Sequence, residues 1–431
     1  MTEPEVKSEE QDTPPKKYVS ADELYRRSSQ YRVWSYTEHE LEELKMQTNE
    51  KGRLVALEKF QSARSALETE KPEVFAVHGA ELTAEIAGLV SFDEEQKYLY
   101  YFSQQIIQIC SHFNMPTQVK ATAMAFFKRF YLVNSVMEHR PKNVLYTIVF
   151  LAAKLENYFV SIESFCTRLP KTKPSDILDL EFIVLLSLKF TLLVHHPYRP
   201  LYGFFLDFQL VLLHPEPVLR DLTIDKIGAL YDNAKKWLND DALLSEVSFL
   251  YTPPQIALAA MYDVDKKITE NYLKRKFLKQ STLDSIKEER REERKKEERM
   301  KREELKRSQI KQEDDGLVKE SPEIQVKLEE EELRKANEDL EMSDVVKSQE
   351  NGDVKQEENI NVKQEDVDTP KAVDPEREQY ETLVKTIKKC IVVAKTKLET
   401  SREESIKIDE KCFFALNPGK LLKKRIKALS T

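Results

Sequence analysis

Two charged residues interrupt apolar segments, and their type and placement make them the most informative side chains in the chain. Lys154 ends the run IVFLAAKLEN at residues 148–157, and Glu181 opens the run LEFIVLLSLKF at residues 180–190. Charged side chains placed in this way are almost never fully buried without a partner. The pattern alone favours a simple interpretation: each residue marks where its helix emerges into solvent, with the two charges able to pair.

No catalytic constellation accompanies them. The sequence contains no glycine-rich phosphate loop, no HExxH, no GxSxG and no kinase HRD or DFG motif. His195 and His196 precede Pro197, where a packed turn is favoured over a metal or catalytic pair. Cys110 and Cys166 lie in apolar helical contexts and are interpreted as small buried residues. We therefore expect no enzyme activity, no cofactor and no metal.

Composition favours an all-α protein in a reducing compartment. Only 8 of the 431 residues are glycine, whereas the abundant residues are strong helix formers. The net charge of −8 does not indicate nucleic-acid binding. Four widely spaced cysteines indicate neither a disulfide framework nor a structural zinc site. No signal peptide or membrane-spanning run is visible, so the expected location is the cytoplasm or the nucleus.

Five apolar segments with helical periodicity fill the first part of the chain. Prolines stand at the breaks between them, where a missing N–H does least harm. The third segment is apolar almost all round until Lys154, which is typical of a helix at the centre of a bundle. The predicted helices cover residues 94–113, 117–133, 142–158, 161–169 and 175–188.

A second set repeats the pattern after Pro197. Its first four predicted helices cover residues 201–213, 223–239, 241–250 running on through YTPPQIALAAMY, and 268–277. Pro253 and Pro254 are expected near the start of the third helix, whose apolar core is 256–261. No aromatic residue then occurs between Phe277 and Tyr380, and such a tract forms no packed core. The amphipathic segment after Tyr380 is the candidate fifth helix, so that the charged tract is an insertion inside the second domain.

The alternation of apolar helical segments with charged, polar segments predicts how the chain divides into domains. Thr37 and Glu40 have capping-box spacing and predict a helix start in the N-terminal part. The expected divisions are a disordered N-terminus at 1–20, an N-terminal helical segment at 21–91, a first domain at 92–194, helices 1–4 of a second domain at 195–277, a charged insertion at 278–375, the last helix of the second domain at 376–400, and a C-terminal helix with a basic tail at 401–431.

The motif LAAKLEN resembles the signature of the cyclin box, a five-helix domain. The resemblance implies two tandem cyclin boxes, the first of which grips a cyclin-dependent kinase. In that family a Lys and a Glu on the fifth helix contact the regulatory helix of the kinase, and Lys154 and Glu181 match them. Leu155, Leu185 and Phe190 match the apolar positions of the adjoining groove. The implied role is activation of a kinase without contributing a catalytic atom.

Longer matches narrow the resemblance to the cyclin H family, and the chain resembles a fungal member of it. They are SSQYRVWSY at 28–36, FFKRFYLVNSVME at 126–138, VHHPYRPLYGFFLD at 194–207 and FLYTPPQIALAA at 249–260. The family implies a nuclear complex with a cyclin-dependent kinase, a RING-finger assembly subunit and core transcription factor IIH. It also implies action on the RNA polymerase II C-terminal repeats and on kinase activation loops. Direct nucleic-acid and membrane contacts are not expected.

Three alternatives remain open from the sequence. The chain could be another transcriptional cyclin, a transcription factor IIB-like DNA-binding protein with cyclin folds, or a helical scaffold. The second would be expected to show a zinc ribbon and a basic face. The third leaves Lys154 and Glu181 unexplained.

Some motifs depart from the family pattern or are weak. The segment EEQKYLYYF lacks the MRAIL-type patch with which cell-cycle cyclins dock substrates. The basic end KLLKKRIK, at residues 420–427, is either a helix surface, which we favour, or a nuclear localisation signal. Sumoylation-type motifs and proline-directed phosphosites arise easily in such a tract, and chance is the favoured explanation for all six. The candidate modified residues are Lys311, Lys327, Lys355, Lys363, Ser321 and Thr369.

Overall fold

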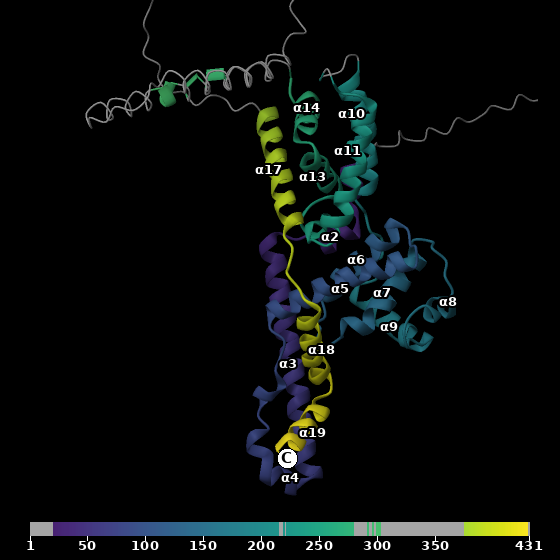
Figure 1. The fold of residues 1–431 in the computed structure, drawn as a ribbon, viewed down its shortest axis with the longest axis vertical. Coiled ribbons are helices and arrows are strands. Elements are labelled where there is room, and N and C mark those ends of the chain that lie inside the picture. The colour runs from purple at the N-terminus through teal and green to yellow at the C-terminus, as the bar shows by residue number, and fades with distance from the viewer. Residues whose placement is uncertain are drawn as a thin grey trace, which may run out of the picture. The chain divides into compact units, whose positions relative to one another are not determined.

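The computed structural model describes residues 20–214, 219, 221–279, 291–292, 295–296, 299–302 and 375–429. Every regular element in these ranges is helical, which confirms the all-α prediction (Figure 1). The chain divides into two compact units. The first comprises Met1–Pro197, Asn239–Ile256 and Val393–Thr431, and the second comprises Tyr198–Leu238 and Ala257–Val392.

The first unit begins with a run of N-terminal helices. The longest has 33 residues and starts where predicted, because Thr37 and Glu40 form a capping box at its first turn. Pro72 begins the next helix, where its missing N–H would be unsatisfied in any case. The helices are α1 (Ala21–Arg27), α2 (Ser29–Trp34), α3 (Glu38–Glu70) and α4 (Pro72–His78), followed by the 3₁₀ turns Gly79–Glu81 and Ala84–Ala87.

Five further helices form the main core of this unit, as the apolar periodicity predicts. The third, α7, packs against α5, α6 and α9, and its residues from Ile148 to Ala153 are all buried. Pro141 and Pro174 occupy the first positions of α7 and α9. The helices are α5 (Phe92–His112), α6 (Thr117–Tyr131), α7 (Pro141–Leu155), α8 (Ile162–Thr167) and α9 (Pro174–Ser187).

Helix α3 approaches this core closely at one glycine. A Cβ added to Gly52 would lie 2.2 Å from the Cβ of Ser135, in the turn after α6. Beside it, the buried Glu95 carboxylate accepts hydrogen bonds from the Asn49 amide at 2.6 Å and from the Ser135 hydroxyl at 2.8 Å. These bonds join α3, α5 and the turn after α6, and they satisfy a buried charge.

Two C-terminal helices complete the first unit: the first packs against α3 and α5, and the second packs against α3 (Figure 1). They are α18 (Arg402–Leu416) and α19 (Pro418–Leu429). The basic end of the chain lies within α19, whose Leu422 is buried. This placement agrees with the favoured helix surface, without testing a targeting role.

The second unit contains α10 (Tyr198–Leu213), α11 (Ile224–Trp237), α13 (Pro253–Val264) from Ala257 onward, α14 (Lys266–Phe277) and α17 (Pro375–Lys395) as far as Val392. Phe208 of α10 stacks on Tyr272 of α14, with ring centroids 3.9 Å apart. Tyr272 also donates a hydrogen bond of 2.5 Å to Asp207. Helix α17 is present where the sequence predicted a helix after Tyr380.

The third helix of this set was expected to begin near Pro253 and Pro254, and α13 confirms this start. The stretch before it, from residue 241, is divided into a π-helical turn at Leu238–Ala242 and a short helix α12 at Val247–Leu250. The break has a plain cause, because Pro253 and Pro254 lack the N–H groups that an α-helix needs in its interior. Both therefore lie at the start of a new helix.

Most of the predicted insertion and the N-terminus to residue 19 lie outside the described residues. Among the described residues, no single helix is long and apolar enough to cross a membrane. One pair of segments, Pro72–Glu81 and Ala84–His112, passes such a test by length and composition, with a bend of 84° between them.

Candidate functional site

The two charges singled out in the sequence meet in the structure. Lys154 lies in the last turn of α7, and its ammonium forms an ion pair with the Glu181 carboxylate of α9. The ammonium also lies over the ring of Phe150, 5.0 Å from its centroid. The Lys154 side chain is 43% exposed and that of Glu181 is 21% exposed. The pair is therefore open to a partner and is held in place by these contacts.

The apolar residues predicted beside this pair differ in exposure. Leu155 and Phe190 are exposed, by 38% and 57%. Leu185, one turn after Glu181, is half-buried and packs against the core. The structure thus places Leu185 partly beneath the surface and leaves Leu155 and Phe190 to present apolar area beside the charges.

Helix α9 exposes further apolar side chains that the sequence interpretation missed. Leu178, Phe182 and Leu186 follow one another at i,i+4 and are 44%, 62% and 50% exposed. The Phe182 ring packs edge-on against Phe190, with centroids 6.5 Å apart. We call Leu155, Leu178, Phe182, Leu186 and Phe190 the α9 apolar face. The i,i+4 spacing was available in the sequence, but α9 is apolar on most sides.

The end of α9 has an unusual backbone. Lys189 and Phe190 both have positive φ, 53° and 51°, a region that side chains other than Gly and Asn rarely adopt. The Phe190 N–H donates to the Leu185 carbonyl at 3.1 Å, closing the helix. Two successive left-handed residues turn the chain sharply, and this turn places Phe190 beside Phe182.

Helix α2 contacts the chain directly after this turn. The Trp34 indole N–H donates to the Thr191 hydroxyl at 2.7 Å, and Arg129 donates to the Thr191 carbonyl at 3.2 Å. The Arg129 guanidinium and the Lys189 ammonium lie 5.3 and 5.4 Å from the Trp34 ring centroid. Burial lowers the pKa of Arg129 to about 10. These contacts link the N-terminal helices to the turn that carries Phe190.

His195 and His196, directly before Pro197, have structural partners. The Gln30 amide donates to the His195 carbonyl at 3.2 Å and accepts from the His195 N–H at 2.7 Å. The Thr122 hydroxyl lies 2.8 Å from His196 Nε2 and donates to Glu156 at 2.6 Å. Both histidines thus belong to a packed turn, as predicted.

All four cysteines are buried free thiols. Burial raises the pKa of Cys110 to about 11, so this thiol is not activated as a nucleophile. Among the residues that the structure describes, no group of three or more His, Cys, Asp or Glu residues could hold a metal ion.

The first-unit segment EEQKYLYYF faces α18. Asp409 of α18 accepts hydrogen bonds from Tyr98 at 2.7 Å and from Arg140 at 2.6 Å, and Lys411 pairs with Glu94 at 2.6 Å. These contacts cover the part of α5 where the sequence predicted the absence of a docking patch. The candidate modified residues, Lys311, Lys327, Lys355, Lys363, Ser321 and Thr369, all lie outside the described ranges.

Comparisons with known proteins identify two cyclin domains in this chain. The cyclin N-terminal domain model matches residues 91–193, and the cyclin C-terminal domain model matches residues 196–395. "Cyclin CCL1" of Saccharomyces cerevisiae is 42% identical, over 64% of this chain and 67% of that protein. "Putative cyclin-H" of Dictyostelium discoideum is 31% identical, over 55% of this chain and 74% of that protein.

Among solved structures, a chain of the CAK complex from Chaetomium thermophilum bound to ATP-γ-S aligns with a TM-score of 0.50 and 28% identity. The alignment covers 60% of this chain and 74% of that one. The sequence and the fold thus agree on two consecutive cyclin boxes, and the chain belongs to the cyclin family, in its cyclin H group.

Proposed function

We propose that this chain is a regulatory cyclin, without catalytic activity of its own, that binds and activates a cyclin-dependent protein kinase. The kinase would be the one associated with transcription factor IIH, acting on the RNA polymerase II C-terminal domain and on the activation loops of other kinases. Family membership and the similarity to a chain of a CAK complex support the proposal. The observation that carries it is the exposed Lys154–Glu181 ion pair beside the α9 apolar face.

In this proposal, apolar contacts supply the affinity for the kinase and the charged residues fix the geometry of the complex. A helix of the kinase laid on Leu155, Phe182 and Phe190 would bury exposed apolar surface and thereby gain affinity. Lys154 and Glu181 would fix the register of that helix, because charge pairs select geometry more than they add affinity. The kinase gains activity when its αC helix, whose Glu pairs with the strand-β3 Lys, is held in the active position.

The proposal extends to partners and location. A RING-finger assembly subunit and core transcription factor IIH would complete the complex, and a nuclear location follows from that role. Lys154, Leu155, Glu181, Leu185 and Phe190 are the proposed kinase-binding residues, to which the structure leads us to add Leu178, Phe182 and Leu186.

Co-expression with candidate kinases, followed by pull-down and kinase assay, tests the proposal. The double variant Lys154→Ala/Glu181→Ala should fold normally and lose most of its kinase binding and activation. A matched control is Lys424→Ala/Glu410→Ala, which removes an exposed ion pair, at 2.7 Å between α19 and α18, and should leave activation unchanged. Undiminished activation by the first double variant would refute the site assignment, and retardation of duplex DNA without kinase binding would favour the DNA-binding alternative.

A further inference from the structure

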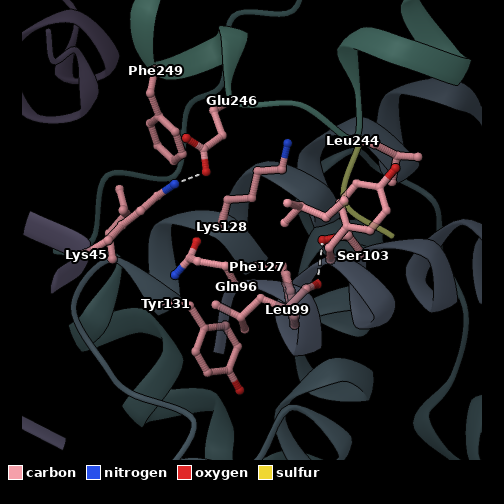
Figure 2. Close-up of a pocket in the computed structure, with 13 residues that line it drawn as sticks. Lys45, Gln96, Leu99, Ser103, Phe127, Lys128, Tyr131, Leu244, Glu246 and Phe249 are labelled. Atoms are coloured by element: carbon pink, nitrogen blue, oxygen red, sulfur yellow. Dashed lines mark hydrogen bonds and ion pairs between the residues drawn. The ribbon is translucent and has the colours of Figure 1, made fainter. Parts of the chain in front are cut away.

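A small pocket lies within the first unit, away from the α9 apolar face. Lys45 of α3, Gln96 of α5, Lys128 of α6 and Glu246, directly before α12, face the same space (Figure 2). Its free volume is about 80 Å³. Most of the remaining walls are apolar, formed by Leu99, Phe127, Leu132, Leu244, Phe249 and Leu398, and Tyr100, Ser103 and Tyr131 complete them.

The charges of the pocket do not balance. Lys45 forms an ion pair with Glu246. Lys128 donates to two uncharged acceptors, the carbonyl of Leu243 at 2.8 Å and that of Ser245, and has no carboxylate partner within the described part of the chain. The enclosure therefore holds two ammonium groups and one carboxylate, which pairs with Lys45 alone.

This imbalance has an energetic consequence. Burial lowers the pKa of Lys45 to about 8. Burial first, and then the positive charge of Lys45, lower the pKa of Lys128 to about 7. A buried charge without a counter-ion costs free energy, and an anion supplied from outside would offset that cost.

The pocket also contains N–H groups that donate no hydrogen bond to a described residue. An ammonium carries three N–H groups, of which Lys128 uses two on carbonyls. The Gln96 side-chain amide makes no hydrogen bond to any described residue, although it faces the pocket. Lys45, Gln96 and Lys128 come from three different helices and line the same pocket (Figure 2).

We propose that this pocket binds a single phosphate group. Two ammonium groups and an amide suit a tetrahedral oxyanion that accepts several charge-assisted hydrogen bonds. The volume admits one such group and excludes a nucleotide. The phosphate would come either from the free ion or from a phosphorylated side chain, whose apolar stem the pocket walls would contact. This site is independent of the proposed kinase-binding face.

Calorimetric titration of the full chain tests the proposal. Inorganic phosphate, a short phosphoserine peptide and the same peptide without phosphate are added at constant ionic strength. Lys128→Met should weaken phosphate binding at least about tenfold, the loss expected for one charge-assisted hydrogen bond. Gln96→Leu should weaken it several-fold without unfolding, because the Gln96 amide has no partner to lose. Lys142→Met, an exposed position on α7, should leave binding unchanged.

The titrations distinguish the two sources. Tighter binding of the phosphopeptide than of free phosphate would identify a phosphorylated side chain, and binding of phosphate alone would identify the free ion. Equal heats for wild type, Lys128→Met and Gln96→Leu would overturn the proposal, as would equal affinity for the two peptides together with no binding of free phosphate. Should Lys128→Met fail to fold, Gln96→Leu decides alone.

Discussion

Trp34 donates its indole N–H to the hydroxyl of Thr191 across 157 residues of sequence, at a distance of 2.7 Å. This bond joins helix α2 to the turn that follows α9. Thr191 comes directly after Phe190, one of the proposed kinase-binding residues. The N-terminal helices therefore contact the backbone that positions one end of the α9 apolar face.

We expect Trp34 and Thr191 to be energetically coupled. Trp34→Phe removes the indole N–H, and Thr191→Val removes the acceptor while keeping the shape. A double-mutant cycle in urea unfolding should give a coupling of about 1 kcal/mol, since a hydrogen bond contributes about that much. A coupling near zero would show that the bond does not stabilise this turn.

The close approach of α3 to Ser135, at Gly52, leads to a second prediction. Gly52→Ala places a methyl group 2.2 Å from the Cβ of Ser135, so either helix α3 or the turn must move. The free energy of unfolding should fall by about 1–3 kcal/mol, as is usual for overpacking. Thermal or urea unfolding measures the change.

Gly228 of α11 supplies the matched control. It lies in a helix, and a Cβ added there meets nothing within 4 Å. Gly228→Ala should therefore stabilise the protein by about 0.5–1 kcal/mol through higher helix propensity. Loss of stability in both variants would mean that crowding at Ser135 is not the cause of the first effect.

Much of the fold was predictable because local sequence determines it. Proline at the helix starts, the capping box of Thr37 and Glu40, and the apolar periodicity gave five helices of the first unit within a few residues. Pro253 and Pro254 likewise predicted the start of α13, although the apolar pattern alone continues across the break that the two prolines impose. Periodicity reports which residues are buried and says less about where the chain bends.

The site was predictable only in part. Lys154 and Glu181 stand out because charge is rare in apolar runs. Phe182 and Leu186 do not stand out, because α9 is apolar on most sides and its exposed side depends on which neighbours pack against it. The contact of Trp34 with Thr191 depends on tertiary structure alone, and no local pattern marks it.

Asp409 makes stability depend on pH in the acid range. Its partial burial acts to raise the pKa of the carboxyl, but the hydrogen bonds from Arg140 and Tyr98 outweigh burial and hold the pKa below its ordinary value. A carboxyl with a lowered pKa in the folded state stabilises that state above its unfolded pKa, about 3.9. The contribution is lost as the pH falls through the lowered, folded-state pKa.

Asp409→Asn should therefore reduce the free energy of unfolding at pH 7 by about 1–3 kcal/mol, the range for hydrogen bonds to charged groups. Near pH 2 the difference from wild type should shrink. Urea unfolding at a series of pH values measures both. Glu410→Gln, which alters the neighbouring exposed pair with Lys424, should leave stability and its pH dependence nearly unchanged. An equal loss at every pH would argue against the linkage.

Substitutions on the α9 apolar face should weaken kinase binding while leaving the stability of the free protein nearly unchanged. Phe182 and Leu186 are 62% and 50% exposed, so replacing both with Ser removes little buried area from the free protein. Unfolding free energy should change by no more than about 0.5 kcal/mol, the usual range for surface substitutions.

Kinase affinity should fall by at least about tenfold, because exposed aromatic and aliphatic anchors carry much of the binding energy at such interfaces. Surface plasmon resonance with the purified kinase measures the affinity. Leu206→Ser/Leu210→Ser on α10 replaces two residues of similar exposure, 49% and 63%, in the second unit and serves as the control. If the control weakens binding as much as the α9 variant does, the kinase contact extends beyond the first cyclin box. If neither does, the kinase binds a different face.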